Sequence, residues 1–193
     1  MKICIFGAAS NKIDEKYIAD CYNLANILAR RGNDLVFGAG GEGLMGAAAR
    51  GFKDGGAKVH GVIPKFFEEN GYEAIFKGCD KLTRTDTMAE RKRTMEDEAD
   101  AFVIVPGGIG TFEEFFEVLT LKQLGRHKKP IVIYDAFGYY DTMNRFLEET
   151  VSKKFVNGEC EKLYVVLRSV GDVVDYLENY SEGGVDWDLL KRN

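Results

Sequence analysis

A short apolar strand that runs directly into a glycine-rich turn and a helix is the feature that most restricts how this chain can fold. The run Ala101–Val105 is brief, rich in β-branched residues and bounded by Pro106, as is typical of a buried strand. Glycines follow at positions 107, 108 and 110, and from Phe112 the apolar residues recur with a helical period. The segment therefore predicts a helix N-terminus whose unpaired N–H groups and dipole can bind an anion.

Strands and helices alternate along the rest of the chain. Strands are expected at 2–6, 35–38, 59–63, 81–84, 101–105, 131–134 and 164–167. Helices are expected at 15–31, 44–54, 87–98, from 112, at 141–154 and from 169, with an irregular loop at 64–78. This alternation predicts a single-domain α/β fold, a Rossmann-like three-layer α/β/α arrangement with a mainly parallel sheet. We expect residues 1–180 to form this nucleotide-binding domain and residues 181–193 a loosely packed C-terminal tail.

The composition limits the function classes. With 193 residues, 45% of them apolar and 30% charged, the chain suits a soluble globular domain. The net charge of −5 argues against general nucleic-acid binding, and no apolar run is long enough to span a membrane, so we expect a cytoplasmic protein. The four cysteines lack CxxC spacing and there are only two histidines, so neither a metal site nor a cofactor is expected.

Two interpretations fit Thr111 and Glu114. Their spacing matches a capping box, in which each side chain would satisfy a backbone donor at the helix start. A cap, however, requires neither the glycines nor Pro106, and Glu114 lies beside an aromatic helix face that would shield it partly from water. Partly shielded carboxylates are frequent at catalytic sites, so Glu114 is also a candidate catalytic residue.

A second glycine loop, residues 38–46, also lies between a strand and a helix. It contains the spacing GxGxxG, but it follows the second strand, and no acidic residue stands where a ribose-binding carboxylate would be expected, which disfavours NAD. Two glycine loops at one edge of the sheet favour a mononucleotide held between them. Gly40, Gly41 and Gly107 are therefore candidate substrate-binding residues.

The helix from Met88 to Met95 supplies cations. Met88, Arg91 and Met95 share one helical face, so that Arg91 interrupts an apolar stripe. Arg93 is spaced to pair with Asp97 on the surface. An arginine in apolar surroundings can bind a phosphate with two parallel hydrogen bonds or hold a carboxylate in place.

Several motifs in a fixed order resemble one known family. They are GLMG at 43–46, GVIPK at 61–65, the pair Arg91-Lys92, PGGxGTxxE at 106–114, QLG at 123–125 and GYY at 138–140. Together they resemble the Lonely Guy (LOG) family of cytokinin-activating phosphoribohydrolases, whose members are often labelled lysine decarboxylase-like. The resemblance implies a Rossmann-like homodimer that hydrolyses the N-glycosidic bond of a cytokinin riboside 5′-monophosphate or AMP.

The resemblance also implies roles for particular residues. Arg91 and Glu114 would be catalytic, and the nucleotide would be bound by Lys92 together with Gly108, Ile109, Gly110 and Thr111. The role of Arg91 stays open between binding the phosphate and orienting Glu114 and the ribose. Apart from the resemblance, a prenylated base needs an apolar slot, for which Phe66, Phe67, Met88 and Tyr139 are candidates that are equally plausible as core residues.

The chain departs from the family pattern at three places. After the first strand only Ser10 can offer a hydroxyl to a sugar or phosphate, and Ala89 stands where the family often has histidine. The acidic residue that the family places after VIPK could be Glu68, Glu69 or Glu73. These differences affect which base is preferred more than whether a nucleotide binds.

Two other functions remain as alternatives to the hydrolase. A carrier that binds a nucleotide or molybdenum cofactor without turnover would need a phosphate site but no catalytic carboxylate. A pyridoxal-phosphate-dependent lysine decarboxylase is disfavoured, because no residue marks a Schiff-base lysine and the chain is short for such folds.

Overall fold

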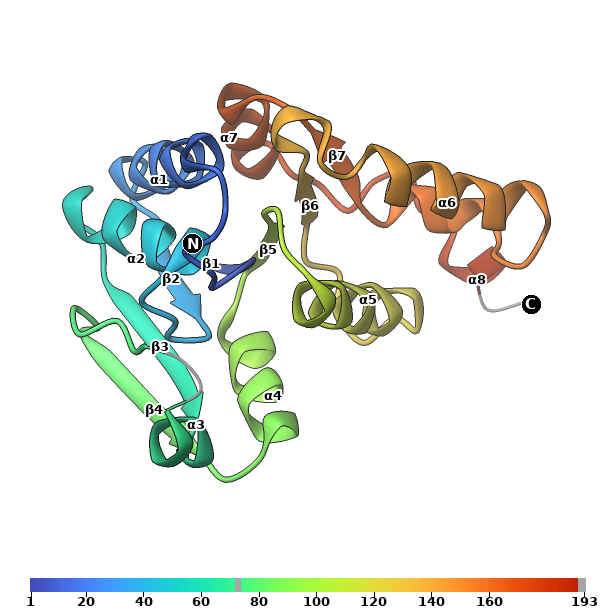
Figure 1. The fold of residues 1–193 in the computed structure, drawn as a ribbon. Helices are drawn as coiled ribbons and strands as arrows, with labels where there is room; N and C mark the ends of the chain where they lie inside the picture. Colours follow the sequence, from blue (N-terminus) through green and yellow to red (C-terminus); the bar gives the residue numbers. More distant parts are fainter. Residues whose placement is uncertain (72–73, 191–193) are drawn as a thin grey trace.

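The chain forms a seven-stranded, fully parallel sheet covered by helices on both faces (Figure 1). The computed structural model describes residues 1–71 and 74–190. The strands are β1 (Lys2–Phe6), β2 (Asp34–Phe37), β3 (Val59–Pro64), β4 (Lys81–Thr85), β5 (Ala101–Ile104), β6 (Ile131–Tyr134) and β7 (Val165–Leu167). The main helices are α1 (Glu15–Arg30), α2 (Gly43–Asp54), α3 (Lys65–Asn70), α4 (Met88–Glu98), α5 (Ile109–Gln123), α6 (Asp141–Ser152), α7 (Val170–Glu178) and α8 (Trp187–Leu190). The predicted α/β class and parallel sheet are confirmed.

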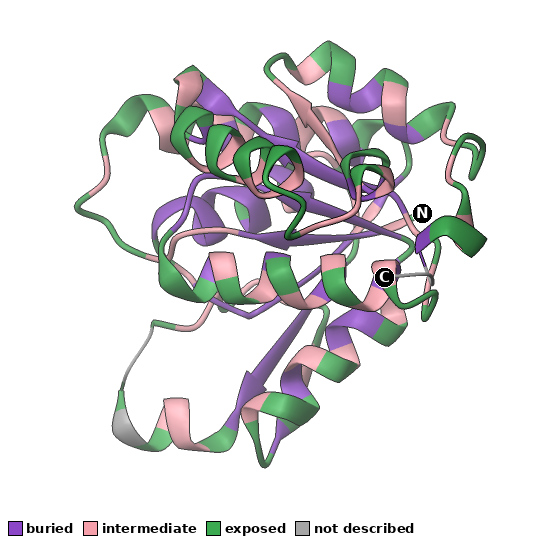
Figure 2. Cartoon of the chain, turned by 90° about the vertical axis from the view of Figure 1, so that its right-hand side faces the viewer, coloured by how far each residue is buried: buried purple, intermediate pink, exposed green. Residues whose placement is uncertain are grey.

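Successive residues of each buried strand face opposite layers. Ile3 and Ile5 of β1 pack in the cluster with α1, α2 and α7, whereas Cys4 and Phe6 pack in the cluster with α4 and α5. This follows from the two-residue period of a strand. The five inner strands β1, β2, β3, β5 and β6 are accordingly buried along almost their whole length, whereas the edge strands β4 and β7 are mostly half-buried or exposed (Figure 2).

The structure differs from the expected elements mainly in the predicted loop at 64–78. Residues Lys65–Asn70 form the short helix α3, which follows Pro64 and ends at Gly71 in the left-handed conformation. Six residues are too few to show a helical period, so the pattern of apolar residues could not reveal this helix. Its flanking proline and glycine are the signals that could have indicated it.

The C-terminal residues add a small third cluster to the fold. Leu190 of α8 is buried against Cys160 and Leu163, with Trp187 packed beside them. The division into a domain of residues 1–180 and a tail of residues 181–193 stays a prediction, and residues 191–193 lie outside the described residues.

The strand order places a crevice at the carboxyl ends of β1 and β5. The order is β4-β3-β2-β1-β5-β6-β7, so the chain winds in one direction from β1 to β4 and then crosses to the other side of β1 with β5. Loops that leave β1 and β5 diverge at this reversal, which is where open α/β sheets bind ligands. The topology thus brings the turn after β1 next to the glycine turn after β5.

A charge cluster joins α4 to the opposite, amino-terminal edge of the sheet. The carboxylate of Glu98 accepts hydrogen bonds from Lys2 Nζ at 2.7 Å and Lys81 Nζ at 3.1 Å, and lies 2.8 Å from His60 Nδ1. Although burial by itself raises the pKa of Glu98, the contacts with Lys2, Lys81 and His60 lower that pKa to about 2. The cluster therefore links the C-terminal end of α4 to β1, β3 and β4.

The lowered pKa predicts a specific pH dependence of stability. Because the folded pKa of Glu98 is about 2 and its ordinary value is 4.5, the ionised group stabilises the fold above pH 4.5 and loses this effect as the pH falls toward 2. We expect Glu98→Gln to lower the free energy of unfolding by roughly 1–3 kcal/mol near pH 6, and by progressively less toward pH 2.

Urea unfolding of the wild-type protein and of Glu98→Gln between pH 2 and pH 6 measures the difference between their free energies of unfolding. Asp97→Asn is the matched control, because the Arg93–Asp97 pair is largely exposed and contributes little. A destabilisation by Glu98→Gln that is the same at pH 6 and pH 2 would contradict the assignment.

Candidate functional site

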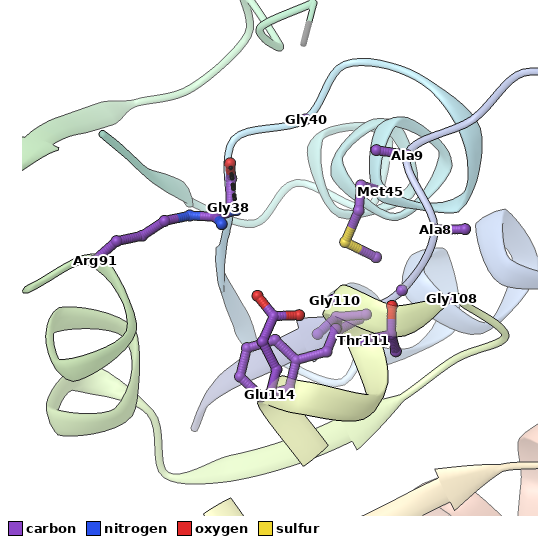
Figure 3. Close-up of a pocket in the computed structure, with 13 residues that line it drawn as sticks. Ala8, Ala9, Gly38, Gly40, Met45, Arg91, Gly108, Gly110, Thr111 and Glu114 are labelled. Atoms are coloured by element: carbon purple, nitrogen blue, oxygen red, sulfur yellow. Dashed lines mark hydrogen bonds between the residues drawn. The ribbon is translucent and has the colours of Figure 1, made fainter. Parts of the chain in front are cut away.

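A cavity of about 300 Å³ lies at the reversal point of the sheet, between the loops that follow β1, β2 and β5 (Figure 3). Its volume is at the lower end of the range for small-ligand sites, roughly 300–1,000 Å³. The lining residues are Ile5, Phe6, Gly7, Ala8, Ala9, Gly38, Gly40, Met45, Arg91, Gly108, Gly110, Thr111 and Glu114. The structure thus brings together both predicted catalytic residues and parts of both glycine loops.

The glycine turn after β5 forms the N-terminus of α5, and the helix begins earlier than the sequence suggested. Gly108 is the N-cap in an extended conformation, and among the described residues no side chain caps this helix end. Thr111 lies inside the first turn, so the capping box considered for Thr111 and Glu114 is wrong at this helix. The extended glycine lets α5 start without a side-chain cap, which leaves its first N–H groups directed out of the helix end.

A true capping box is present at the neighbouring helix α4. The Thr87 hydroxyl accepts a hydrogen bond from the Glu90 amide at 3.1 Å, and the Glu90 carboxylate accepts one from the Thr87 amide at 3.3 Å. This reciprocal pairing fixes the first turn of α4. Arg91 follows one residue later and is thereby carried at a well-defined position.

Arg91 crosses from α4 to the ends of two strands. The residue is only 8% exposed, Nε donates to the carbonyl of Val62 at 3.2 Å, and Nη2 donates to the carbonyl of Gly38 at 3.1 Å. The centroid of the Phe67 ring lies 5.6 Å from Arg91 Cζ. A methyl group at position 38 would come within 1.8 Å of Nη2, so the guanidinium requires glycine there. Arg91 is therefore a fixed cation in the cavity wall.

Glu114 projects into the same cavity from the second turn of α5. Figure 3 shows its carboxylate and the Arg91 guanidinium extending from different helices toward the same space. Glu114 is partly exposed, and its charge also acts on the buried thiol of Cys4 on β1 beneath the cavity. Burial, reinforced by Glu114, raises the pKa of Cys4 well above its ordinary value, which keeps that thiol protonated.

Lys92 does not line this cavity. Its ammonium group is paired with the carboxylates of Glu113 and Glu117 on α5, the latter at 2.7 Å. Residues 91 and 92 point in different directions because adjacent helical positions are about 100° apart. In the structure Lys92 therefore links α4 to α5, and its predicted role in binding a nucleotide stays a prediction.

The other predicted binding residues divide into two groups. Gly40, Gly108, Gly110 and Thr111 line the cavity. Ser10, Gly41, Met88, Gly107 and Ile109 lie outside the lining set. Of these, Met88 still touches the site, since its Sδ is 3.9 Å from Arg91 Nη1, whereas Ile109 is 86% exposed.

The loop carboxylates proposed from the sequence are placed outside the cavity lining or outside the described part of the chain. Glu68 accepts two hydrogen bonds from Arg84, at 2.7 and 3.0 Å, and Glu69 is exposed. Glu73 lies outside the described residues.

Sequence reasoning missed several members of the lining. Gly7, Ala8, Ala9 and Met45 belong to it, and none of these four side chains carries a charge or a hydroxyl that would have indicated a site. The signal that could have found them is the parallel topology itself, since residues that follow β1 must meet residues that follow β5. Met45 enters because α2 begins beside this loop, where its amide donates to the carbonyl of Ala8 at 3.2 Å.

Comparisons with known proteins place the chain in a family. The family model described as "Possible lysine decarboxylase" matches residues 45–177. The chain is 36% identical over 179 residues to cytokinin riboside 5′-monophosphate phosphoribohydrolase LOG2 of Arabidopsis thaliana, which covers 93% of this chain and 83% of that protein. It is 35% identical over 190 residues to cytokinin riboside 5′-monophosphate phosphoribohydrolase LOG of Oryza sativa subsp. japonica, covering 97% and 78% respectively. The chain belongs to the Lonely Guy (LOG) family.

Solved structures share the fold of this LOG-family protein. The molybdenum cofactor carrier protein of Chlamydomonas reinhardtii superimposes with a TM-score of 0.70 at 21% identity, covering 99% of this chain and 98% of that one. The molybdenum cofactor binding protein of Rippkaea orientalis gives a TM-score of 0.65 at 15% identity, covering 92% and 94%. At these identities the likeness concerns the fold.

Two further features of the described residues bear on function. None of the helices among them has the length and apolar character needed to cross a bilayer. Nor do residues 1–71 and 74–190 contain a group of three or more histidine, cysteine or acidic side chains placed to hold a metal ion.

Proposed function

We propose that this LOG-family protein hydrolyses the N-glycosidic bond of a purine nucleoside 5′-monophosphate, such as AMP or a cytokinin riboside 5′-monophosphate, and releases the free base and ribose 5-phosphate. The observation that carries the proposal is the convergence of Glu114, Arg91 and the N-terminus of α5 on one cavity. The names of the relatives at about 35% identity support the same reaction.

The geometry suits separate recognition of the phosphate and the scissile bond. The first N–H groups of α5 and the positive end of its dipole attract a phosphate, and the glycines at 108 and 110 let it approach closely. Arg91 keeps donors beyond the two that it uses on Gly38 and Val62, because a guanidinium has five N–H groups. Binding of the phosphate would then hold the ribose in a fixed orientation for reaction.

Glu114 is the residue that we assign to the chemical step. As the C1′–N9 bond breaks, its electron pair leaves with the base and positive charge develops on the ribose. The carboxylate of Glu114 can stabilise that charge, or accept a proton from the water that adds to C1′. The base nitrogen takes up a proton from solvent, so that the net reaction adds the hydroxyl of water to C1′ and a proton to the base.

The cavity favours hydrolysis over the two other functions. A carrier needs a phosphate site but has no need of a carboxylate at Glu114. A pyridoxal phosphate enzyme needs a lysine for the Schiff base, and none of the described residues that line this cavity is a lysine. Nucleotide binding without release of base would support the carrier instead.

One prediction of the proposed function concerns the phosphate. We expect AMP to be cleaved roughly 10- to 1,000-fold faster than adenosine, measured as kcat/KM, because only the nucleotide can use the N-terminus of α5 and Arg91. Chromatographic detection of released base from AMP, isopentenyladenosine monophosphate, GMP, CMP and adenosine makes the comparison and identifies the preferred base. Equal rates with AMP and adenosine would refute the phosphate site.

Another prediction of the proposed function concerns Glu114. We expect Glu114→Gln to lower kcat for AMP by at least ~100-fold while the protein still folds and binds AMP, because the substitution removes the charge but keeps the shape of the side chain. Glu113→Gln is the matched control on the preceding residue, which pairs with Lys92 and does not line the cavity. If Glu114→Gln retained turnover close to that of Glu113→Gln, the catalytic role of Glu114 would be wrong.

We further propose that the protein acts as a homodimer. Phe112, Phe116, Met143 and Phe146 of α5 and α6 line an open apolar groove, and Phe116 and Phe146 are 38% and 60% exposed. Helix α6 has no buried residue in the single chain. The apolar residues around the 112–124 helix predict that this helix and the 88–95 helix lie at or near the interface. Because the exposed residues of α4 are mostly polar, we place the centre of the proposed dimer interface on α5 and α6.

The corresponding prediction is a dimer that depends on this groove. In sedimentation velocity at micromolar concentration we expect twice the chain mass, and we expect Phe146→Asp to sediment as a monomer because a charge there cannot be buried without a partner. Leu189→Asp, an exposed leucine on α8 outside the groove, should stay dimeric. A monomeric wild-type protein would exclude the proposal.

A further inference from the structure

The two tyrosines of the GYY segment make hydrogen bonds to the glycine turn that the proposed reaction does not explain. The hydroxyl of Tyr139 donates to the carbonyl of Gly107 at 2.6 Å, and the hydroxyl of Tyr140 donates to the carbonyl of Val105 at 2.8 Å. The carbonyl between them, that of Pro106, accepts from the amide of Ala8 at 3.1 Å. Three consecutive carbonyls at the end of β5 are therefore held in place from outside the turn.

Holding a carbonyl also orients the N–H group of the same peptide unit. The unit between Gly107 and Gly108 is planar and trans, so its N–H points away from its carbonyl oxygen. The Gly107 carbonyl is directed to Tyr139, which does not line the cavity, whereas Gly108 does line it. The Gly108 N–H is thereby directed away from Tyr139.

The segment that carries the tyrosines is itself firmly held. The buried carboxylate of Asp135 accepts from the Tyr140 amide at 2.6 Å and from Arg168 Nε at 3.0 Å. Phe137 has a positive φ of 58°, a conformation that a residue other than glycine keeps only where its surroundings enforce it. The Tyr139 ring contacts the Tyr17 ring edge-on, with centroids 6.0 Å apart.

We propose that Tyr139 and Tyr140 are positioning residues, which orient the Val105–Gly108 peptide units so that the Gly108 N–H faces a phosphate in the cavity. Tyr140 holds the end of β5, and Tyr139 sets the orientation of the Gly108 amide. This inference deepens the proposed function and rests on the proposed function for the identity of the anion. The hydrogen bonds that support the inference are all formed between residues of this chain.

The test is Tyr139→Phe, which removes the hydroxyl and keeps the ring that packs on Tyr17. AMP and adenosine affinities are measured by calorimetry in the Glu114→Gln background, where turnover is suppressed. We expect AMP to bind about 5- to 10-fold more weakly and adenosine to bind unchanged, on the scale of one lost hydrogen bond to the loop. Equal weakening of both ligands, or no weakening of AMP, would overturn the proposal.

A second measurement decides the matter if the proposed function itself fails and AMP does not bind. In ¹⁵N-glycine-labelled protein without ligand, the Gly107 and Gly108 amide signals should shift or broaden in Tyr139→Phe. Tyr22→Phe is the matched control, because its hydroxyl bonds to Asp54 at 2.8 Å on a different part of the surface. Unchanged Gly107 and Gly108 signals in Tyr139→Phe would show that the tyrosine does not position the turn.

Discussion

The buried guanidinium of Arg91 and the two carbonyls that it binds determine how α4 sits against the sheet. The residue is only 8% exposed, and two of its donors bond to the carbonyls of Gly38 and Val62 at the ends of β2 and β3, which offsets part of the cost of burying the charge. The contact leaves no room for a side chain at position 38. The same bonds that hold the helix therefore also hold a positive charge in the wall of the cavity, so the packing of this layer and the electrostatics of the site share one cause.

The opposite wall of the cavity depends on backbone groups rather than on side-chain charge. The N-terminus of α5 begins at an extended glycine, and hydrogen bonds from Tyr139, Tyr140 and Ala8 hold the three carbonyls that precede it. Such a wall presents fixed dipoles whose orientation is already established before a ligand arrives. Glu114 lies one turn further along the same helix, so a change in the turn would alter the proposed phosphate site and the carboxylate together.

The two edges of the sheet differ in what their charged residues do. At the amino-terminal edge Glu98 is surrounded by Lys2, Lys81 and His60, and this compensated cluster stabilises the fold. Lys92 belongs to a similar link, since it pairs with Glu113 and Glu117 between α4 and α5. At the carboxyl edge Arg91 bonds to the neutral carbonyls of Gly38 and Val62, and within residues 1–71 and 74–190 no ion pair joins it to a carboxylate. The proposed anion site depends on this difference.

The alternation of apolar runs and amphipathic segments was enough to predict the parallel α/β fold, because strand and helix periods are local properties of the chain. The two glycine loops could likewise be placed at one edge of the sheet, since parallel strands end together, and the family resemblance assigned Arg91 and Glu114 to the same site. Local patterns could not show that Lys92 turns toward α5, that Gly38 must make room for Arg91, or that Gly7 to Ala9 and Met45 complete the cavity. Nor could they show that α5 starts at Ile109 with Gly108 as its cap, after a turn whose carbonyls accept hydrogen bonds from Tyr139 and Ala8. Those features depend on contacts between residues far apart in the sequence, and only the tertiary structure decides them.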